Sequence, residues 1–183
     1  LNNLAYIHST CQDFESFLWH IQETIKSPPL KKEKVDSREL LEDLRESISY
    51  LEISHPNISF IFGEDVDSIS FYAEIKSLKR VFLNVIQNAI NSFEKEQNDS
   101  SVKGKVHLSY QKKDQTIVFF VEDNGPGIEE TLHDKVYKPL SNFDSPYEIG
   151  LGTSIAFDII NRHGGTISFH SQAGKTIVSI SLP

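Results

Sequence analysis

The sequence is poor in cysteine, methionine and positive charge, and each shortage excludes a class of protein. Its 183 residues include one cysteine, Cys11, and no methionine. A single cysteine cannot form an internal disulfide, which argues against a secreted domain and favours a reducing compartment. The 18 Lys and Arg against 26 Asp and Glu give a net charge of -8. Such an acidic chain would repel a phosphate backbone, so nucleic acid is not an expected partner.

Long apolar runs are also missing. No stretch approaches the ~20 apolar residues that a membrane-spanning helix needs, and the amino terminus has no basic-then-apolar signal pattern. We therefore expect this piece to be soluble, with any membrane contact made through segments outside it. Because the sequence begins at Leu1 and contains no methionine, we expect it to be part of a longer protein.

The first 26 residues predict a bundle helix. Their apolar residues follow alternating three- and four-residue steps, the a/d pattern of helices that pack on a partner helix. These residues are Leu4, Ile7, Cys11, Phe14, Leu18, Ile21 and Ile25. The pattern stops at Ser27-Pro28-Pro29, and the charged residues that follow predict a linker. The sequence thus predicts a helix over 1–26, a linker over 27–35 and a folded domain over 36–183.

Within the domain, the residue patterns predict an α+β fold. Asp36 and Glu39 have the spacing of a capping box at the start of an amphipathic helix. A longer helical pattern follows Phe71, and a third ends at His163-Gly164-Gly165. Short β-rich runs occupy 58–62, 106–110, 117–121, 166–169 and 176–182. We expect a two-layer sandwich in which helices cover one face of a mixed, largely antiparallel sheet.

The run Asp123-Asn124-Gly125-Pro126-Gly127-Ile128 follows one of these strand patterns directly. A carboxylate placed there can accept a hydrogen bond from an adenine amino group, while the glycines let the backbone pass close to the base. Asp-Asn-Gly clusters are also common turn formers, so the run by itself fits a tight turn capped by Asp123 equally well.

Three asparagines, Asn84, Asn88 and Asn91, share one side of the second predicted helix. A polar stripe on a helix is usually solvated surface. Lys or Glu would form helix better there, whereas an amide oxygen can ligate Mg²⁺ without adding charge that repels a triphosphate. The choice of asparagine therefore favours a metal or phosphate role.

Gly150-Leu151-Gly152 opens the third helix, and the unpaired N–H groups of a helix start suit phosphate oxygens. The same run could be a plain flexible helix entry. About twenty residues of weak periodicity precede it, at 129–149, and a connection of that length predicts a lid. The order of asparagine helix, Asp-x-Gly-x-Gly turn, lid and Gly-x-Gly helix is more specific than any single motif.

In this order the motifs resemble the catalytic and ATP-binding domain of sensor histidine kinases, in the superfamily that includes gyrase and Hsp90. The resemblance covers residues 36–183 and rests on four boxes and on a closing segment, His163 to Ile167. The boxes are Asn84-Val-Ile-Gln-Asn88-Ala-Ile, Asp123 to Ile128, Val136-Tyr137-Lys138-Pro139-Leu140 and Gly150-Leu151-Gly152-Thr153-Ser154-Ile155.

The resemblance implies Mg-ATP as ligand and assigns a role to each box. Asn88 would coordinate Mg²⁺, Asn84 would contact phosphate or its water, and Asp123 would bind the adenine amino group. The other implied nucleotide contacts are Asn91, Gly125, Gly127, Ile128, Lys138, Gly150, Leu151, Gly152, Thr153 and Thr176. One departure is Glu148, which stands where many relatives have the first glycine of the last box.

The resemblance further implies a kinase that transfers the γ-phosphoryl group to a histidine on an upstream helix. Neither His8 nor His20 has the expected Glu or Asp and Pro after it, so we expect the acceptor upstream. It also implies dimerisation through the first helix, a response regulator or receiver domain as partner, and a cytoplasmic place in a membrane-bound bacterial sensor kinase.

Two other functions remain open. An ATP-hydrolysing conformational machine would have Glu one turn before the metal asparagine, where this chain has Asn84, which cannot act as a general base. A regulatory scaffold that binds ATP without transferring phosphate is kept open by Glu148 and the missing acceptor.

Overall fold

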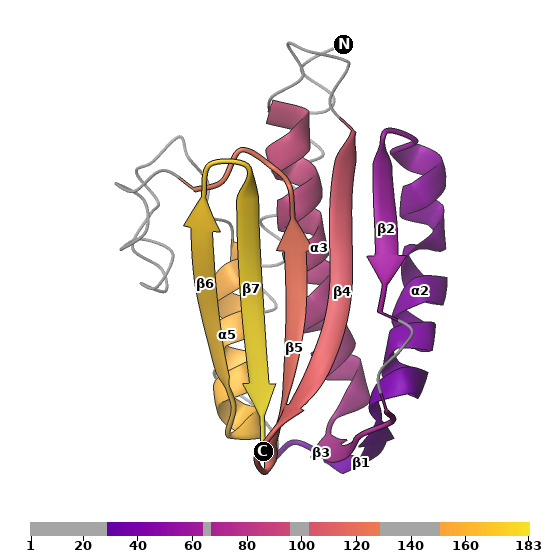
Figure 1. Ribbon diagram of the computed structural model, residues 1–183. Coiled ribbons are helices and arrows are strands. Elements are labelled where there is room, and N and C mark those ends of the chain that lie inside the picture. Colours follow the sequence, from indigo (N-terminus) through magenta and orange to yellow (C-terminus); the bar gives the residue numbers. More distant parts are fainter. Residues whose placement is uncertain (1–28, 64–66, 96–102, 129–150) are drawn as a thin grey trace.

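The computed structural model describes residues 29–63, 67–95, 103–128 and 151–183, and it has two layers (Figure 1). Figure 1 shows α3 and α5 behind one face of a sheet, with α2 beside the edge strand β2. The elements are β1 Glu33–Asp36, α2 Ser37–Ser54, β2 Ile58–Phe62, β3 Ser70–Ala73, α3 Ile75–Lys95, β4 Gly104–Lys113, β5 Thr116–Asp123, α5 Leu151–His163, β6 Thr166–Gln172 and β7 Lys175–Leu182. The predicted α+β sandwich is confirmed.

The main sheet has the strand order β2-β4-β5-β7-β6. β2 pairs with β4 in parallel, and the other neighbours are antiparallel. Buried and less buried residues alternate along β7, as expected for a sheet with one covered face. The central strand β5 contributes Phe119, whose ring meets Phe82 of α3 edge-on with 5.2 Å between centroids. The core therefore lies between β5 and α3.

The ends of the helices follow the sequence predictions. Asp36 caps α2, and its carboxylate accepts a hydrogen bond from Arg38 N–H at 2.8 Å. The predicted apolar stripe of α2 is buried in full: Leu40, Leu41, Leu44, Ile48 and Leu51. At the end of α5, Gly164 has a φ of 79°, and Gly165 N–H donates to Ile160 O at 3.0 Å. This is the glycine stop that the sequence predicts.

The predicted linker over 27–35 is wrong at its carboxyl end. Glu33–Asp36 forms β1, which pairs antiparallel with β3 from Glu33↔Ala73 to Asp36↔Ser70. Val35 is buried in the core. Four residues are too few to show the alternating pattern of a strand, and the strand that pairs with them lies far along the chain. The charged composition of this segment therefore led to the prediction of a linker.

Two predicted segments lie outside the described residues: the bundle helix over 1–26 and the lid over 129–149. Among the helices that the structure describes, none is both long and apolar enough to cross a membrane.

Candidate nucleotide-binding site

The first part of the site lies where α3 meets the amino end of α5. Asn84 Nδ2 donates to Gly152 O at 3.2 Å, and Asn88 Nδ2 donates to Thr153 Oγ1 at 3.3 Å. Thr153 is buried, whereas Asn88 is exposed. The structure thus brings together the predicted metal and phosphate residues of two boxes that are more than 60 residues apart in the chain.

Asn91 lies further along α3 and makes a different contact. Its Oδ1 accepts a hydrogen bond from Gln87 Nε2 at 2.9 Å, and both residues are exposed. This is a pair one turn apart on the same helix. A nucleotide contact by Asn91 stays a prediction.

The second part of the site is the turn after β5. Asp123 is 7% exposed, and its Oδ1 accepts a hydrogen bond from Gly125 N–H at 2.9 Å. Asp123 therefore caps a turn, as one of the two sequence interpretations predicts, but this contact uses only one of its two carboxylate oxygens. Within the described ranges the Gly125 N–H is the donor that contacts this carboxylate, so Oδ2 can accept a further bond.

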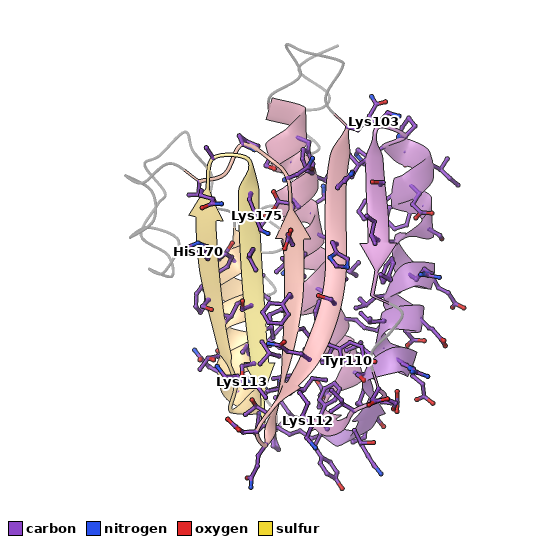
Figure 2. All side chains as sticks on the ribbon, in the orientation of Figure 1. Lys103, Tyr110, Lys112, Lys113, His170 and Lys175 are labelled. Atoms are coloured by element: carbon purple, nitrogen blue, oxygen red, sulfur yellow. The ribbon has the colours of Figure 1, made fainter. Side chains whose placement is uncertain are left out.

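The surroundings of Asp123 disfavour the ionised form of its carboxyl. Burial raises the pKa of this carboxyl, and the neighbouring charge of Glu122 adds to the increase, while the Gly125 N–H opposes it. Glu122 itself pairs with Lys175 Nζ at 2.8 Å, and Figure 2 shows Lys175 at the start of β7. A partner that donates a hydrogen bond to Asp123 would therefore relieve a cost of folding.

Close contacts surround both glycines of the turn, with side chains at Gly125 and with backbone at Gly127. A Cβ on Gly125 would lie 2.6 Å from Ser92 Oγ of α3 and 2.8 Å from Asp123 Oδ1. Gly127 has a φ of +87°, and a Cβ there would lie 2.4 Å from Gln172 O. The turn thus passes directly between α3 and the end of β6, and the pocket-shaping role of its glycines stays a prediction.

A hydroxyl pair supports this turn from the sheet. Thr176 is buried and lies opposite both Asp123 and Ser171 in the strand registers. Ser171 Oγ lies 3.0 Å from Thr176 Oγ1 and accepts a hydrogen bond from Ile128 N–H at 2.8 Å. The structure therefore brings together three predicted residues, Asp123, Ile128 and Thr176.

Ser171 is a candidate site residue that the sequence analysis missed. It follows Ile167 and Phe169 at alternate positions of β6, which contribute to the core side of the sheet. The sequence signal was a polar residue at a position where the alternation of the strand predicts an inward-facing side chain.

The two parts of the site are neighbours. Asn88, beside α5, and Ser92, beside the Asp123 turn, are one turn apart on α3, or about 6 Å along its axis. One face of α3 therefore connects the contacts with Gly152 and Thr153 to the Asp123 turn.

Magnesium fits the donor set at Asn88. No three His, Cys, Asp or Glu side chains of the described ranges come together as a metal site. An ion there would be held by an amide oxygen together with phosphate oxygens and water, which is how proteins commonly hold Mg²⁺ with a nucleotide.

Two predicted contacts, Lys138 and Gly150, lie outside the described residues, and so does Glu148, the departure in the last box. Leu151 is the first residue of α5. The roles of Lys138, Gly150 and Leu151 in phosphate binding stay predictions.

Known proteins are similar to this chain in sequence. Residues 73–183 match the family described as histidine kinase-, DNA gyrase B-, and HSP90-like ATPase. Sporulation kinase B of Bacillus subtilis is 30% identical over 146 residues, which cover 78% of this chain and 32% of that protein. Sensory histidine kinase/phosphatase NtrB of Salmonella typhimurium is 31% identical over 112 residues, which cover 59% of this chain and 32% of that protein. The chain thus spans about a third of the length of these relatives.

Solved structures share the fold. The catalytic domain of histidine kinase ThkA has a TM-score of 0.69 and 24% identity, with coverage of 84% of this chain and 96% of that chain. ThkA in complex with the response regulator protein TrrA has a TM-score of 0.75 and 23% identity, with coverage of 97% of this chain and 49% of that chain. With a family match over residues 73–183, this chain belongs to the family of histidine kinase-, DNA gyrase B- and HSP90-like ATPases.

Proposed function

We propose that the domain binds Mg-ATP and transfers its γ-phosphoryl group to a histidine on a preceding helix, in the same subunit or in a dimer partner. The observation that supports this most is the contact of Asn84 and Asn88 with Gly152 and Thr153 at the start of α5. It places uncharged amides and a helix amino terminus on one patch, which suits a triphosphate.

Each end of the nucleotide has its own residues. Asp123 Oδ2 would accept the adenine amino group, while Gly125 and Gly127 keep the backbone beside the base. The N–H groups at the start of α5, including that of Thr153, would hold phosphate oxygens. Mg²⁺ at Asn88 would neutralise the charge of the phosphates. Phosphoryl transfer depends mostly on such positioning and charge neutralisation.

Asn84 favours transfer to a histidine over hydrolysis. It stands one turn before Asn88 on α3, where an ATP-hydrolysing relative would place a glutamate to activate water. An amide cannot take a proton from water. One relative that is named as a sensory histidine kinase/phosphatase and another that is named as a sporulation kinase support the same choice.

The partners follow from the same proposal. One similar structure is described as a histidine kinase in complex with a response regulator protein, which supports a receiver domain as the partner here. Residues 1–26 would contribute to dimerisation, and the acceptor histidine and any membrane anchor would lie in upstream sequence of a bacterial sensor kinase.

The test combines binding, turnover and transfer. Calorimetry should show that the chain binds Mg-ATP, and phosphate release should be slow. With the upstream sequence restored, radiolabelled ATP should give an acid-labile, base-stable phosphoprotein. Steady phosphate release by the chain alone would favour the hydrolysing machine, and binding without any transfer in the longer protein would favour the scaffold.

A further inference from the structure

The end of α5 that lies away from the nucleotide site is held by a buried histidine. His163 is the last residue of α5 and is 0% exposed. Its Nδ1 lies 2.7 Å from Ile159 O, and its Nε2 accepts a hydrogen bond from Glu74 N–H at 3.0 Å. Glu74 directly precedes α3, and Leu78 N–H donates to its carbonyl. The imidazole therefore joins the end of α5 to the start of α3.

The protonation state of the ring agrees with this arrangement. Nε2 can accept a hydrogen bond only in the neutral ring with the proton on Nδ1. Burial lowers the pKa of His163, and the charge of Lys32 lowers it further. The neutral form is therefore the one that fits its surroundings.

The segment before β1 is attached to the same two residues. Lys32 Nζ donates to His163 O at 2.8 Å, and Lys31 N–H donates to Glu74 Oε1 at 3.2 Å. Ser77 binds the other carboxylate oxygen of Glu74, and this hydrogen bond is the main reason that the pKa of Glu74 is lowered. Three distant parts of the chain thus meet at His163 and Glu74.

Helix α5 connects this cluster with the phosphate end of the site. It has 13 residues, which make a rod of about 20 Å. It packs against the core through Ile155, Ile159 and Ile160. A shift at His163 would therefore be carried along the rod to Gly152 and Thr153, which contact Asn84 and Asn88.

We propose that His163 is a positioning residue for the phosphate end of the nucleotide site, because its bond to Glu74 N–H sets the position of α5 along α3. The hydrogen bond from Lys32 Nζ to His163 O also fixes the end of α5, and it links the position of α5 to the segment that precedes the domain. This role rests on the nucleotide site of the proposed function and extends it to residues that do not contact the ligand.

The test compares a ligand that has phosphates with one that has none. In the full chain, His163→Phe keeps a ring but loses both nitrogen contacts. It should raise the Kd of Mg-ATP by about fivefold to tenfold, the lower range for coupling between sites. The Kd of adenosine should change by less than about twofold, because the two features lie at opposite ends of β7: Asp123 is opposite Thr176, whereas Thr166, just after α5, is opposite Ser181. His163→Gln, whose Oε1 can accept the Glu74 N–H, should recover most of the ATP affinity.

Matched controls separate the contact from a general loss of structure. His170→Phe makes the same replacement at an exposed position on β6 (Figure 2) and should leave both affinities unchanged. Lys32→Ala removes a side-chain donor and should raise the Kd of Mg-ATP by about twofold, below the usual range of couplings between sites. Lys31→Ala should have no effect, because Lys31 contacts Glu74 through its backbone.

The outcomes distinguish this role from the site itself. Equal weakening of ATP and adenosine by His163→Phe, in a chain with a native circular dichroism spectrum, would overturn the positioning role. So would unchanged ATP affinity. If His163→Phe does not fold, the other two variants test the proposal. Failure of His163→Gln to recover ATP affinity would refute the role of the bond to Glu74 N–H. Wild-type ATP affinity in Lys32→Ala would refute the link to the preceding segment. A wild-type chain that binds neither ligand would overturn the nucleotide site as well.

Discussion

The two ends of the α3–α5 pair are built in opposite ways. At the proposed nucleotide end, Asn84 and Asn88 make hydrogen bonds of 3.2 and 3.3 Å, and Asn88 is exposed. At the other end, His163 makes bonds of 2.7 and 3.0 Å and is fully buried. Long bonds at an exposed position can be exchanged for contacts with a ligand, whereas removing a buried partner leaves a polar group unsatisfied. The first end is suited to binding and the second to holding the fold.

The same contrast extends to charge. Asp123, on the nucleotide side, is a buried carboxylate whose pKa is raised. His163, on the closed side, is a buried base whose pKa is lowered by the same cause, burial. On the binding side the unfavourable charge can be matched by a ligand, and on the closed side the neutral ring is already matched by the protein.

The largest expected effect is on binding, at Asp123. In Asp123→Asn the amide oxygen can still accept the Gly125 N–H, but an NH₂ group would face the adenine amino group. We expect a loss of about tenfold to a hundredfold in ATP affinity by calorimetry, with a melting temperature equal to or above that of the wild type. Glu122→Gln is the matched control, since Glu122 pairs with Lys175, and its ATP affinity should be unchanged. Equal affinities in Asp123→Asn and the wild type would leave Asp123 as a turn former only.

The next effect is on stability, at His163. His163→Phe leaves the Glu74 N–H without its acceptor, and we expect a loss of about 1–3 kcal/mol in the free energy of unfolding. Urea unfolding of the full chain measures it. Asn88→Ala should change the same quantity by less than about 0.5 kcal/mol, as is usual for an exposed position. Equal losses in the two variants would remove the contrast between the two ends of the helix pair.

Replacing Asn88 should instead affect the binding of magnesium. In Asn88→Ala we expect the dependence of ATP affinity on Mg²⁺ to disappear, because the amide ligand is lost. Titration of magnesium at constant ATP tests this, with Gln87→Ala as the control from the neighbouring exposed position of α3. A magnesium titration identical to that of the wild type would refute the metal role of Asn88.

The smallest expected effect is a difference between His163 and Asp123 in how each makes the free energy of unfolding depend on pH. The folded pKa of His163 lies below its ordinary value of 6.5, so the unfolded chain binds more protons and stability falls as pH decreases below 6.5. The groups that act on the ring are Lys32, Glu74 and Arg162. The folded pKa of Asp123 lies above its ordinary value of 3.8, so its contribution has the opposite sign and is lost as pH rises through the folded pKa.

Two variants separate these signs. Urea unfolding between pH 5 and 7 should show a flatter pH dependence in His163→Phe than in the wild type. Asp123→Asn should remove the loss of stability that accompanies ionisation at higher pH. A pH dependence in His163→Phe as steep as that of the wild type would mean that another group titrates in this range.

Much of the fold and of the site depends on short-range features, and the sequence by itself determined these. The buried stripe of α2, its cap at Asp36 and the glycine stop after His163 were all predicted correctly. A helix period, a cap and a turn that needs positive φ involve residues within a few positions of each other, so their pattern is visible in the chain. The candidate residues Asn84, Asn88 and Asp123 were identified in the same way.

Only the tertiary structure decided which of these residues meet. The strand β1, the hydroxyl of Ser171 beneath Ile128, the contact of Asn88 with Thr153 and the attachment of Lys32 to His163 all join segments that are distant in sequence. Such contacts depend on strand register and on the packing of α5 along α3. Local patterns carry no information about either, because each is set by the whole core at once.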